Sequence, residues 1–318
     1  MIQMQLSITV PGQINEAGAV RSTVSLVNKS PAARLWIGQS FLLDGMQTLA
    51  YVAGTGASCP VGVGVSLAAM RSPYESALQV RTLAALSGQP VSAGFGAAQP
   101  GFVRAVSGEE WSAPGQALLD YAAAVKDAFD PSAQPRDSAR FTSPALPPLA
   151  DAPAIEVGVG AVRPWLFSRG LQQADFVATW LAPSHYVATQ LEQTSASRAR
   201  LVCIAPLAVS RIGRSIMVIA REAVGHHIRQ PHYAEMLSHS GLLRESEEST
   251  VKSLLDSGTV LNGHLASVID QLRTLETAGV DEVVLDATAV RSLRSHDEAL
   301  DDYEAVLNAW SNRKGSPE

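Results

Sequence analysis

The sequence of 318 residues has few cysteines, few lysines and no long apolar run, and each shortage excludes a class of protein. Its two cysteines, Cys59 and Cys203, lie far apart and form no C-x-x-C pair, so neither a disulfide framework nor a zinc site is indicated. No apolar stretch approaches the length that spans a bilayer. The first ten residues alternate apolar and polar side chains and lack the basic start and apolar block of a signal peptide. We therefore expect a cytoplasmic protein that does not enter a membrane.

Lysine and clustered basic charge are also scarce. The formal net charge is −6 with 17% charged residues, and no basic stripe is present, so nucleic acid is not an expected partner. None of the lysines follows a predicted strand, which excludes the Schiff-base chemistry of aldolases and pyridoxal phosphate enzymes. These lysines are Lys29, Lys126, Lys252 and Lys314.

Strand-like runs recur along the chain with helical stretches between them, which is typical of parallel β/α units. Eight such runs are present, the number of strands in a TIM barrel, and the chain length suits a barrel with insertions. We predict an α/β protein that forms one (β/α)8 TIM barrel over residues 1–318. The predicted strands are Met4 to Val10, Arg34 to Phe41, Pro60 to Leu67, Pro90 to Phe95, Ile155 to Val162, Phe176 to Leu181, Leu201 to Val209 and Glu282 to Asp286.

Helix boundaries are marked by capping residues. The stretch from Ser72 to Glu75 has the pattern of a capping box with proline at the first helical position, and the helix that begins there should end before Gly88. Apolar residues from Leu265 to Leu275 recur on one helical face, and Gly279 should end that helix just before the last strand.

Two segments depart from a minimal barrel. Residues 130–153 contain six prolines and form a predicted insertion after the fourth helix, which is either a lid over the barrel mouth or a passive surface loop. Residues 212–255 form an extended helical region between the seventh and eighth strands, which we interpret as extra packing within the same domain.

The C-terminal ends of the predicted strands, where barrel enzymes carry their active sites, hold few groups that titrate near neutral pH. Amides and hydroxyls predominate there, at Gln39, Ser40, Ser66, Gln99 and Thr179. Asp286 is the one obvious carboxylate, so a glycosidase pair and a metal-binding cluster are not expected. We place the histidines between 226 and 239 with packed or solvated helix residues, because their spacing matches no standard metal-ligand pair. The sequence therefore indicates chemistry borrowed from a cofactor.

Two glycine clusters follow strands and are candidates for contact with that cofactor. Residues 94–99 follow a predicted strand and include Gly96 and Gln99. Residues 158–163 lead from a strand into a helix and offer free backbone N–H groups. Each cluster alone is equally compatible with a tight bend.

The order and spacing of several segments together resemble the luciferase-like oxidoreductase family, which includes bacterial luciferase, flavin monooxygenases and deazaflavin (coenzyme F420) dependent reductases. The segments that carry this resemblance are residues 35–39, 61–66, 71–74, 82–88, 94–96, 155–160 and 278–286.

The resemblance implies roles for individual residues. It implies coenzyme F420, or alternatively FMN, as the cofactor, and a homodimer as the assembly. A bulge with a non-proline cis peptide should fall at Gly64 and Val65, behind the cofactor ring. The cofactor phosphate should lie at the turn of Gly160, Ala161, Val162 and Arg163. The implied contacts of the ring and the substrate are Gln39, Ser40, Gly96 and Gln99, with Phe41 and Trp180 as candidate substrate contacts.

The sequence differs from the alcohol-oxidising deazaflavin enzymes of that family, which carry an acid and a histidine after strand two and an acid after strand four. Here Gln39, Ser40 and Gln99 stand in those places, and such groups do not accept a proton near neutral pH. We therefore expect a reductase that delivers hydride to an electron-poor C=C or C=N bond, with His185, Tyr186 or water as the proton donor.

The substrate class is a small molecule or a peptide, possibilities that include peptide natural products such as thiopeptides and lanthipeptides. An FMN-dependent monooxygenase and a flavin-binding barrel without catalytic activity are the alternatives.

Overall fold

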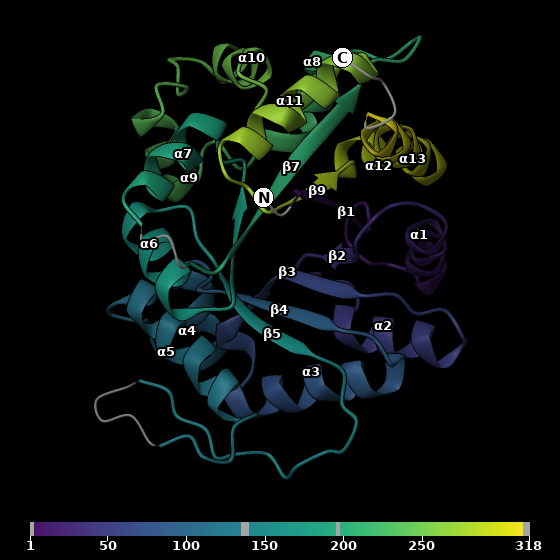
Figure 1. Ribbon diagram of the computed structural model, residues 1–318. Coiled ribbons are helices and arrows are strands. Elements are labelled where there is room, and N and C mark those ends of the chain that lie inside the picture. The colour runs from purple at the N-terminus through teal and green to yellow at the C-terminus, as the bar shows by residue number, and fades with distance from the viewer. Residues whose placement is uncertain (1–2, 135–139, 195–197, 314–318) are drawn as a thin grey trace.

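Eight parallel strands close into a barrel in the computed structural model, which describes residues 3–134, 140–194 and 198–313 (Figure 1). The first six strands pair in chain order, β6 pairs with β7, and β9 lies between β7 and β1. The predicted (β/α)8 TIM barrel is confirmed. The barrel strands are β1 (Gln5–Thr9), β2 (Leu35–Ile37), β3 (Val61–Leu67), β4 (Val91–Gly96), β5 (Ile155–Gly160), β6 (Phe176–Trp180), β7 (Arg200–Val209) and β9 (Glu282–Asp286).

A ninth strand, β8 (Leu261–Gly263), was not predicted from the sequence. It pairs with the last three residues of β7, Leu207 to Val209, after β7 has finished pairing with β9 at Pro206. The ten-residue β7 therefore extends beyond the barrel, and its upper end belongs to a separate two-stranded pair.

Helices lie between the strands, and the predicted caps are present. Ser72 and Glu75 form a capping box at the start of α3, and Gly88 ends that helix with a φ of 64°. Gly279, with a φ of 91°, follows α11 as expected. The helices up to β7 are α1 (Ala17–Lys29), α2 (Gly45–Gly54), α3 (Pro73–Ser87), α4 (Pro100–Ser107), α5 (Pro114–Asp127), α6 (Pro164–Gln173) and α7 (Ser184–Glu192).

The predicted helical region between the seventh and eighth barrel strands consists of α8 (Ile216–Val224), α9 (Pro231–His239) and α10 (Glu247–Asp256), followed by β8 and α11 (Leu265–Thr277). The chain ends with α12 (Thr288–Leu293) and α13 (His296–Asn312) after β9. Within the described part of the chain, no helix is both long enough and apolar enough to cross a bilayer.

Two large aromatic side chains fill the interior of the barrel. Trp36 from β2 and Phe176 from β6 meet edge to face, with ring centroids 5.6 Å apart. Glycines on the neighbouring strands leave room for them, because a Cβ on Gly62 would lie 2.3 Å from the indole and one on Gly158 would lie 2.6 Å from the phenyl ring. The alternation of large and small residues therefore closes the barrel centre to solvent.

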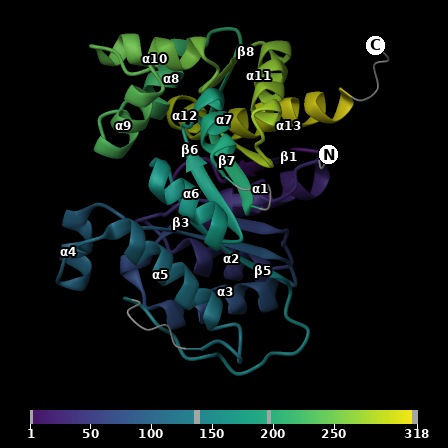
Figure 2. The same ribbon diagram turned by 60° about the vertical axis from the view of Figure 1, so that its left-hand side comes forward.

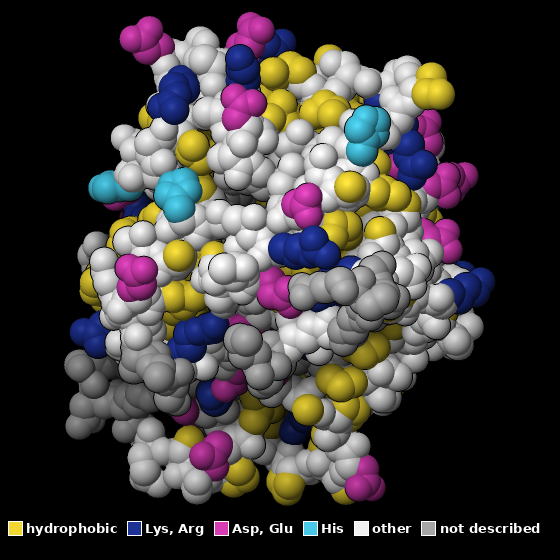
Figure 3. Space-filling view, turned by 45° about the horizontal axis from the view of Figure 1, so that its top comes forward, with side chains coloured by type: hydrophobic (Ala, Val, Ile, Leu, Met, Phe, Trp, Pro, Cys, Tyr) yellow, Lys and Arg dark blue, Asp and Glu magenta, His cyan; other side chains and the backbone are white. Residues whose placement is uncertain are grey.

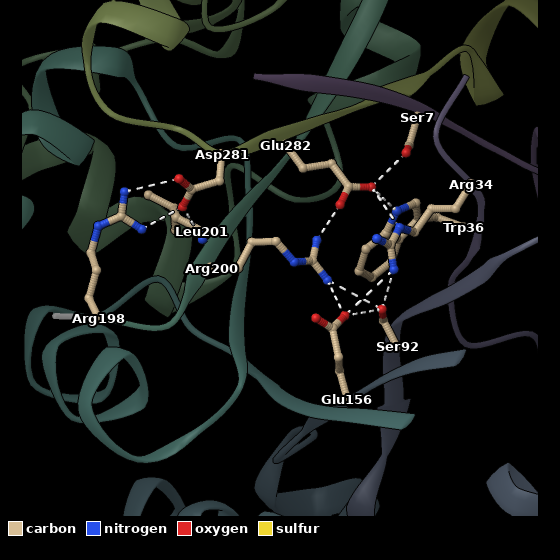
Figure 4. A network of polar contacts seen from close by, with 10 residues as sticks. All are labelled: Ser7, Arg34, Trp36, Ser92, Glu156, Arg198, Arg200, Leu201, Asp281 and Glu282. Atoms are coloured by element: carbon tan, nitrogen blue, oxygen red, sulfur yellow. Dashed lines mark hydrogen bonds and ion pairs between the residues drawn. The ribbon is translucent and has the colours of Figure 1, made fainter. Parts of the chain in front are cut away.

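A network of charged residues lies below these aromatic rings, at the N-terminal end of the barrel (Figure 4). Glu282 is fully buried and accepts hydrogen bonds from Ser7 Oγ at 2.6 Å and Trp36 Nε1 at 2.7 Å. Arg200 pairs with Glu282 and, at 2.5 Å, with Glu156. Each buried charge therefore faces an opposite charge, which is the condition for burying it at tolerable cost.

The proline-rich segment 130–153 joins the end of α5 to the start of β5, and its described residues contain no helix or strand. Phe141 packs edge to face on Tyr121 of α5, Leu146 N donates to Ala128 O, and Arg81 of α3 donates to Pro147 O. This segment and the helices α8 and α10 lie at opposite ends of the molecule in both views (Figure 1, Figure 2). The contacts favour a surface segment on α3 and α5, and the lid stays a prediction.

Candidate functional site

The third strand carries the irregularity that the family resemblance implied. The pairing of β3 with β4 shifts register between Val63 and Ser66, and the Gly64–Val65 peptide is cis, as predicted. The side chain of Val65 projects toward two glycines, since a Cβ on Gly96 would lie 2.6 Å from Val65 Cγ2 and one on Gly160 would lie 2.9 Å from Val65 Cγ1. The structure thus brings these predicted site residues together at the C-terminal end of the barrel.

The turn from β5 into α6 offers unpaired backbone donors. Ala161 N donates to Ala178 O at 2.9 Å, whereas the N–H groups of Val162 and Arg163 have no acceptor among the described residues. They directly precede the N-terminus of α6, where the helix dipole favours an anion. The turn that the resemblance assigned to a phosphate therefore has the donors that a phosphate needs.

Tyr186 holds this turn in place. Its hydroxyl donates a hydrogen bond of 2.5 Å to Val162 O, and burial raises its pKa to about 12. Because its proton is committed to a backbone carbonyl, the structure gives Tyr186 a positioning role. His185, the other predicted proton donor, is exposed on α7 with Nε2 3.0 Å from Ser240 O.

The polar side chains after β2 are engaged in local hydrogen bonds. Gln39 Nε2 donates to Ser40 O at 2.7 Å, and Gln39 Oε1 accepts from Leu67 N at 3.2 Å. Ser40 is buried and donates to Ile14 O at 3.2 Å. These bonds fasten the β2–α2 loop to β3 and to the loop after β1, and cofactor contact by Gln39 and Ser40 stays a prediction.

Phe41, a predicted substrate contact, lies in the same loop with its ring 60% exposed. It meets Phe102 of α4 edge to face, with ring centroids 5.8 Å apart. This pair, from the loop after β2 and from α4, therefore presents the exposed ring of Phe41 at the rim of the mouth.

The segment from α8 to α9 contacts the ends of three strands. Gln99 after β4 donates to Gln230 Oε1 at 3.3 Å, Arg163 after β5 pairs with Glu235 at 2.8 Å, and Trp180 at the end of β6 meets His227. The sequence pattern of residues 212–255 predicted only extra packing and did not predict that they lie beside the site. Helical periodicity identifies such a segment but does not give its direction in space.

An aromatic cluster covers the end of β6. His227 lies between Trp180, at a centroid distance of 4.3 Å, and Tyr233, at 5.8 Å, and Tyr233 lies 5.2 Å from Trp180. Burial lowers the pKa of His227, His226 adds to this effect, and Asp286 at the end of β9 opposes it. The cluster therefore places an ionisable imidazole at the mouth of the barrel.

Three arginines near the mouth are paired with carboxylates. Arg104, Arg163 and Arg211 each pair with a carboxylate, those of Glu110, Glu235 and Asp302. On the face shown in Figure 3, basic and acidic side chains are interspersed and neither sign gathers into a patch. The described charges therefore give no special attraction to a long acidic cofactor tail.

Comparison with protein families places the chain. The model of the family described as luciferase-like monooxygenase matches residues 18–282. The chain belongs to this family of oxidoreductases. A comparison with curated proteins finds no match.

Solved structures of similar fold include enzymes of two cofactor classes. An F420-dependent secondary alcohol dehydrogenase, in complex with an F420–acetone adduct, is 13% identical with a TM-score of 0.73, over 97% of this chain and 99% of that one. The coenzyme F420 dependent tetrahydromethanopterin reductase of Methanopyrus kandleri is 14% identical with a TM-score of 0.67, over 97% of each chain. The FMN-bound oxygenating constituent of 3,6-diketocamphane monooxygenase from Pseudomonas putida is 10% identical with a TM-score of 0.65, over 96% of this chain and 98% of that one. At these identities the likeness shows the fold.

Proposed function

We propose that this luciferase-like oxidoreductase is an F420-dependent reductase that transfers hydride to an electron-poor C=C or C=N bond. The supporting observation is the set of residues at the mouth. Val65 and the glycines beside it, Gly96 and Gly160, form a narrow apolar backing suited to a flat ring. The free N–H groups of Val162 and Arg163 suit the phosphate of the same cofactor. When bound, the reduced deazaflavin supplies the hydride.

The direction of reaction follows from what the mouth provides. Alcohol oxidation needs a base that takes the hydroxyl proton, and the strand-two and strand-four positions carry the amides of Gln39 and Gln99. Both amides also hydrogen-bond to the protein, to Leu67 N and Gln230 respectively. These residues can orient a substrate and exclude water. Reduction needs only a weak proton donor in addition.

A second candidate is an FMN-dependent monooxygenase, which one observation favours. Three arginines near the mouth are paired with carboxylates, so these three give little attraction to the long acidic tail of a deazaflavin. A cofactor with a single phosphate would need only the turn at Gly160 to Arg163. The fold and the ring-backing residues serve both candidates.

Anaerobic titration of the purified protein with coenzyme F420 and with FMN, followed by fluorescence, distinguishes the candidates. We expect saturable binding of F420 in the micromolar range or tighter, and oxidation of reduced F420 on addition of an enone or imine acceptor. Tight FMN binding with oxygen consumption in place of these results would favour the monooxygenase. If neither F420 nor FMN binds, both candidates are refuted.

The substrate and the assembly are proposals of the same kind. A peptide natural product such as a thiopeptide or lanthipeptide is our proposed substrate class, and the acceptor screen should include dehydroamino acid peptides.

We also propose a homodimer, since the neighbouring helices α2 and α3 expose Tyr51, Leu78 and Leu86. Light scattering after gel filtration would give twice the 33.5 kDa chain mass for a dimer.

A further inference from the structure

His227 lies close to the part of the mouth that backs the proposed cofactor. Its ring is 4.3 Å from that of Trp180, and Trp180 packs against the interior cluster of Trp36, Phe176 and Ile204. Val65 packs against the same cluster. A substrate seated between Val65 and the α8–α9 segment would therefore meet the imidazole of His227.

The imidazole is also chemically available. Within residues 3–134, 140–194 and 198–313, neither ring nitrogen of His227 has a hydrogen-bond partner, and the side chain is only half-buried. The two donors predicted from the sequence differ in this respect. Tyr186 donates a hydrogen bond to Val162 O, and His185 is exposed on α7 with its Nε2 3.0 Å from Ser240 O.

We propose that His227, whose imidazole packs on Trp180 at the end of β6, delivers the proton that completes reduction of the substrate. This inference rests on the proposed reductase function. Asp286 Oδ1 accepts a hydrogen bond from Thr288 N at 3.0 Å, which fixes the carboxylate at the end of β9. His227 is the proposed catalytic residue, and the negative charge of Asp286 acts on its pKa through space.

The step balances in atoms and charge. The bound cofactor would supply a hydride that forms a C–H bond at the electron-poor carbon of the substrate, and the π electrons of the C=N or conjugated C=C bond would move to the far atom. That atom takes the proton of the His227 imidazolium as the N–H bond breaks, which leaves a neutral imidazole. Solvent then returns a proton to the imidazole, and the substrate has gained two electrons and two protons with one hydride and one proton transferred.

The protonation of His227 depends on groups from three elements. Burial lowers its pKa below the usual histidine range, and the neighbouring His226 and His232 of α9 lower it further, whereas Asp286 raises it. Tyr233, whose ring also contacts His227, has a hydroxyl pKa raised by burial and stays neutral over this range. Turnover should therefore fall as pH rises through the His227 pKa.

The test compares His227→Asn, Asp286→Asn and the matched control His239→Asn, an exposed histidine whose Nδ1 lies 2.8 Å from Glu235 O. We expect His227→Asn to slow anaerobic single turnover about 100-fold at pH 6 and to abolish the fall of rate with rising pH. Asp286→Asn should move that fall to lower pH, and His239→Asn should leave the profile unchanged.

A second readout does not need the cofactor. Histidine titration by NMR, with His227 assigned by the His227→Asn variant, should give a midpoint below the usual histidine value of about 6.5 and a further decrease in Asp286→Asn. Cofactor binding by His227→Asn should match that of the unaltered protein, which controls for folding.

The outcomes separate this inference from the function on which it rests. If the unaltered protein binds neither F420 nor FMN, the proposed reductase function and this inference are both overturned. Normal turnover with an unchanged pH profile in His227→Asn would overturn this inference alone. So would loss of the pH dependence in His185→Asn but not in His227→Asn. An NMR midpoint of His227 that does not move in Asp286→Asn would remove the role of Asp286.

Discussion

Trp36 Nε1 donates a hydrogen bond of 2.7 Å to Oε1 of Glu282 inside the barrel, so a large interior side chain is bonded to a fully buried charge. Glu282 also faces Arg34, with Nε 3.4 Å from Oε1, and Arg200 (Figure 4). This arrangement joins β2, β7 and β9 below the site.

Replacement of Glu282 by Gln should destabilise the protein strongly. The change leaves two arginines facing a neutral group, and breaking a buried ion pair on one side costs about 3–5 kcal/mol. Urea denaturation followed by circular dichroism would measure the loss. Glu248→Gln is the control, since Glu248 is exposed and its carboxylate lies 3.9 Å from the Arg221 guanidinium. Equal stability of the two variants would contradict the prediction.

Replacement of Gly158 by Ala should disturb the barrel interior. The new Cβ would lie 2.6 Å from three atoms of the Phe176 ring, and overpacking of this kind costs about 1–3 kcal/mol. In contrast, Gly18→Ala in α1 adds a methyl group with nothing within 4 Å and should be neutral or slightly stabilising. Thermal melts of both variants would test the difference, and a Gly158→Ala midpoint equal to or above that of the unaltered protein would refute it.

Replacement of Gly160 by Leu should weaken cofactor binding while the barrel still folds. Even a single Cβ at this position would approach Val65 Cγ1 to 2.9 Å, so the larger side chain should push Val65 into the proposed ring site. We expect the dissociation constant for the cofactor to rise at least tenfold in a fluorescence titration. Gly101→Ala, which meets nothing within 4 Å, serves as control. Unchanged affinity in Gly160→Leu would place the cofactor elsewhere.

Stability at acid pH should depend on Glu156. Burial raises the pKa of Glu156, but the hydrogen bond from Ser92 and the charge and hydrogen bond of Arg200 outweigh burial, so the net shift is downward. A carboxyl with a lowered folded pKa stabilises the protein above its unfolded pKa of about 4.3 and loses this effect as pH falls through the folded value. Glu156→Gln should therefore flatten the decline of unfolding free energy below about pH 5. A decline as steep as that of the unaltered protein would count against this account.

The strands and the β3 bulge were predictable for different reasons. Each barrel strand carries a local apolar pattern, and the position of the bulge at Gly64 and Val65 came from the family resemblance. The three-residue β8 gave no pattern, because its pairing with Leu207 to Val209 depends on tertiary contacts.

The candidate site was predictable only in part. Val65, Gly96 and Gly160 do converge, but the hydrogen bonds that occupy Ser40 and Tyr186 depend on partners distant in the sequence, Ile14 and Val162. The orientation of His227 depends on how α8 and α9 dock. The sequence does contain one indication of the interior ion network. Charged residues of both signs lie at or next to the first residues of barrel strands, at Arg34, Glu156, Arg200 and Glu282.

The long β7 strand has a consequence for how this barrel can diversify. Its upper end, paired with β8, carries α8 to α10 outside the ring of barrel strands, so this segment can change in length or sequence without altering the register of any barrel strand. The same segment contributes Gln230, Glu235 and His227 to the rim of the mouth. Evolution and protein engineering can therefore vary the rim of the mouth by changing residues of 212–256 other than the proposed proton donor His227, while the proposed cofactor contacts Val65, Gly96 and Gly160 stay fixed in the barrel.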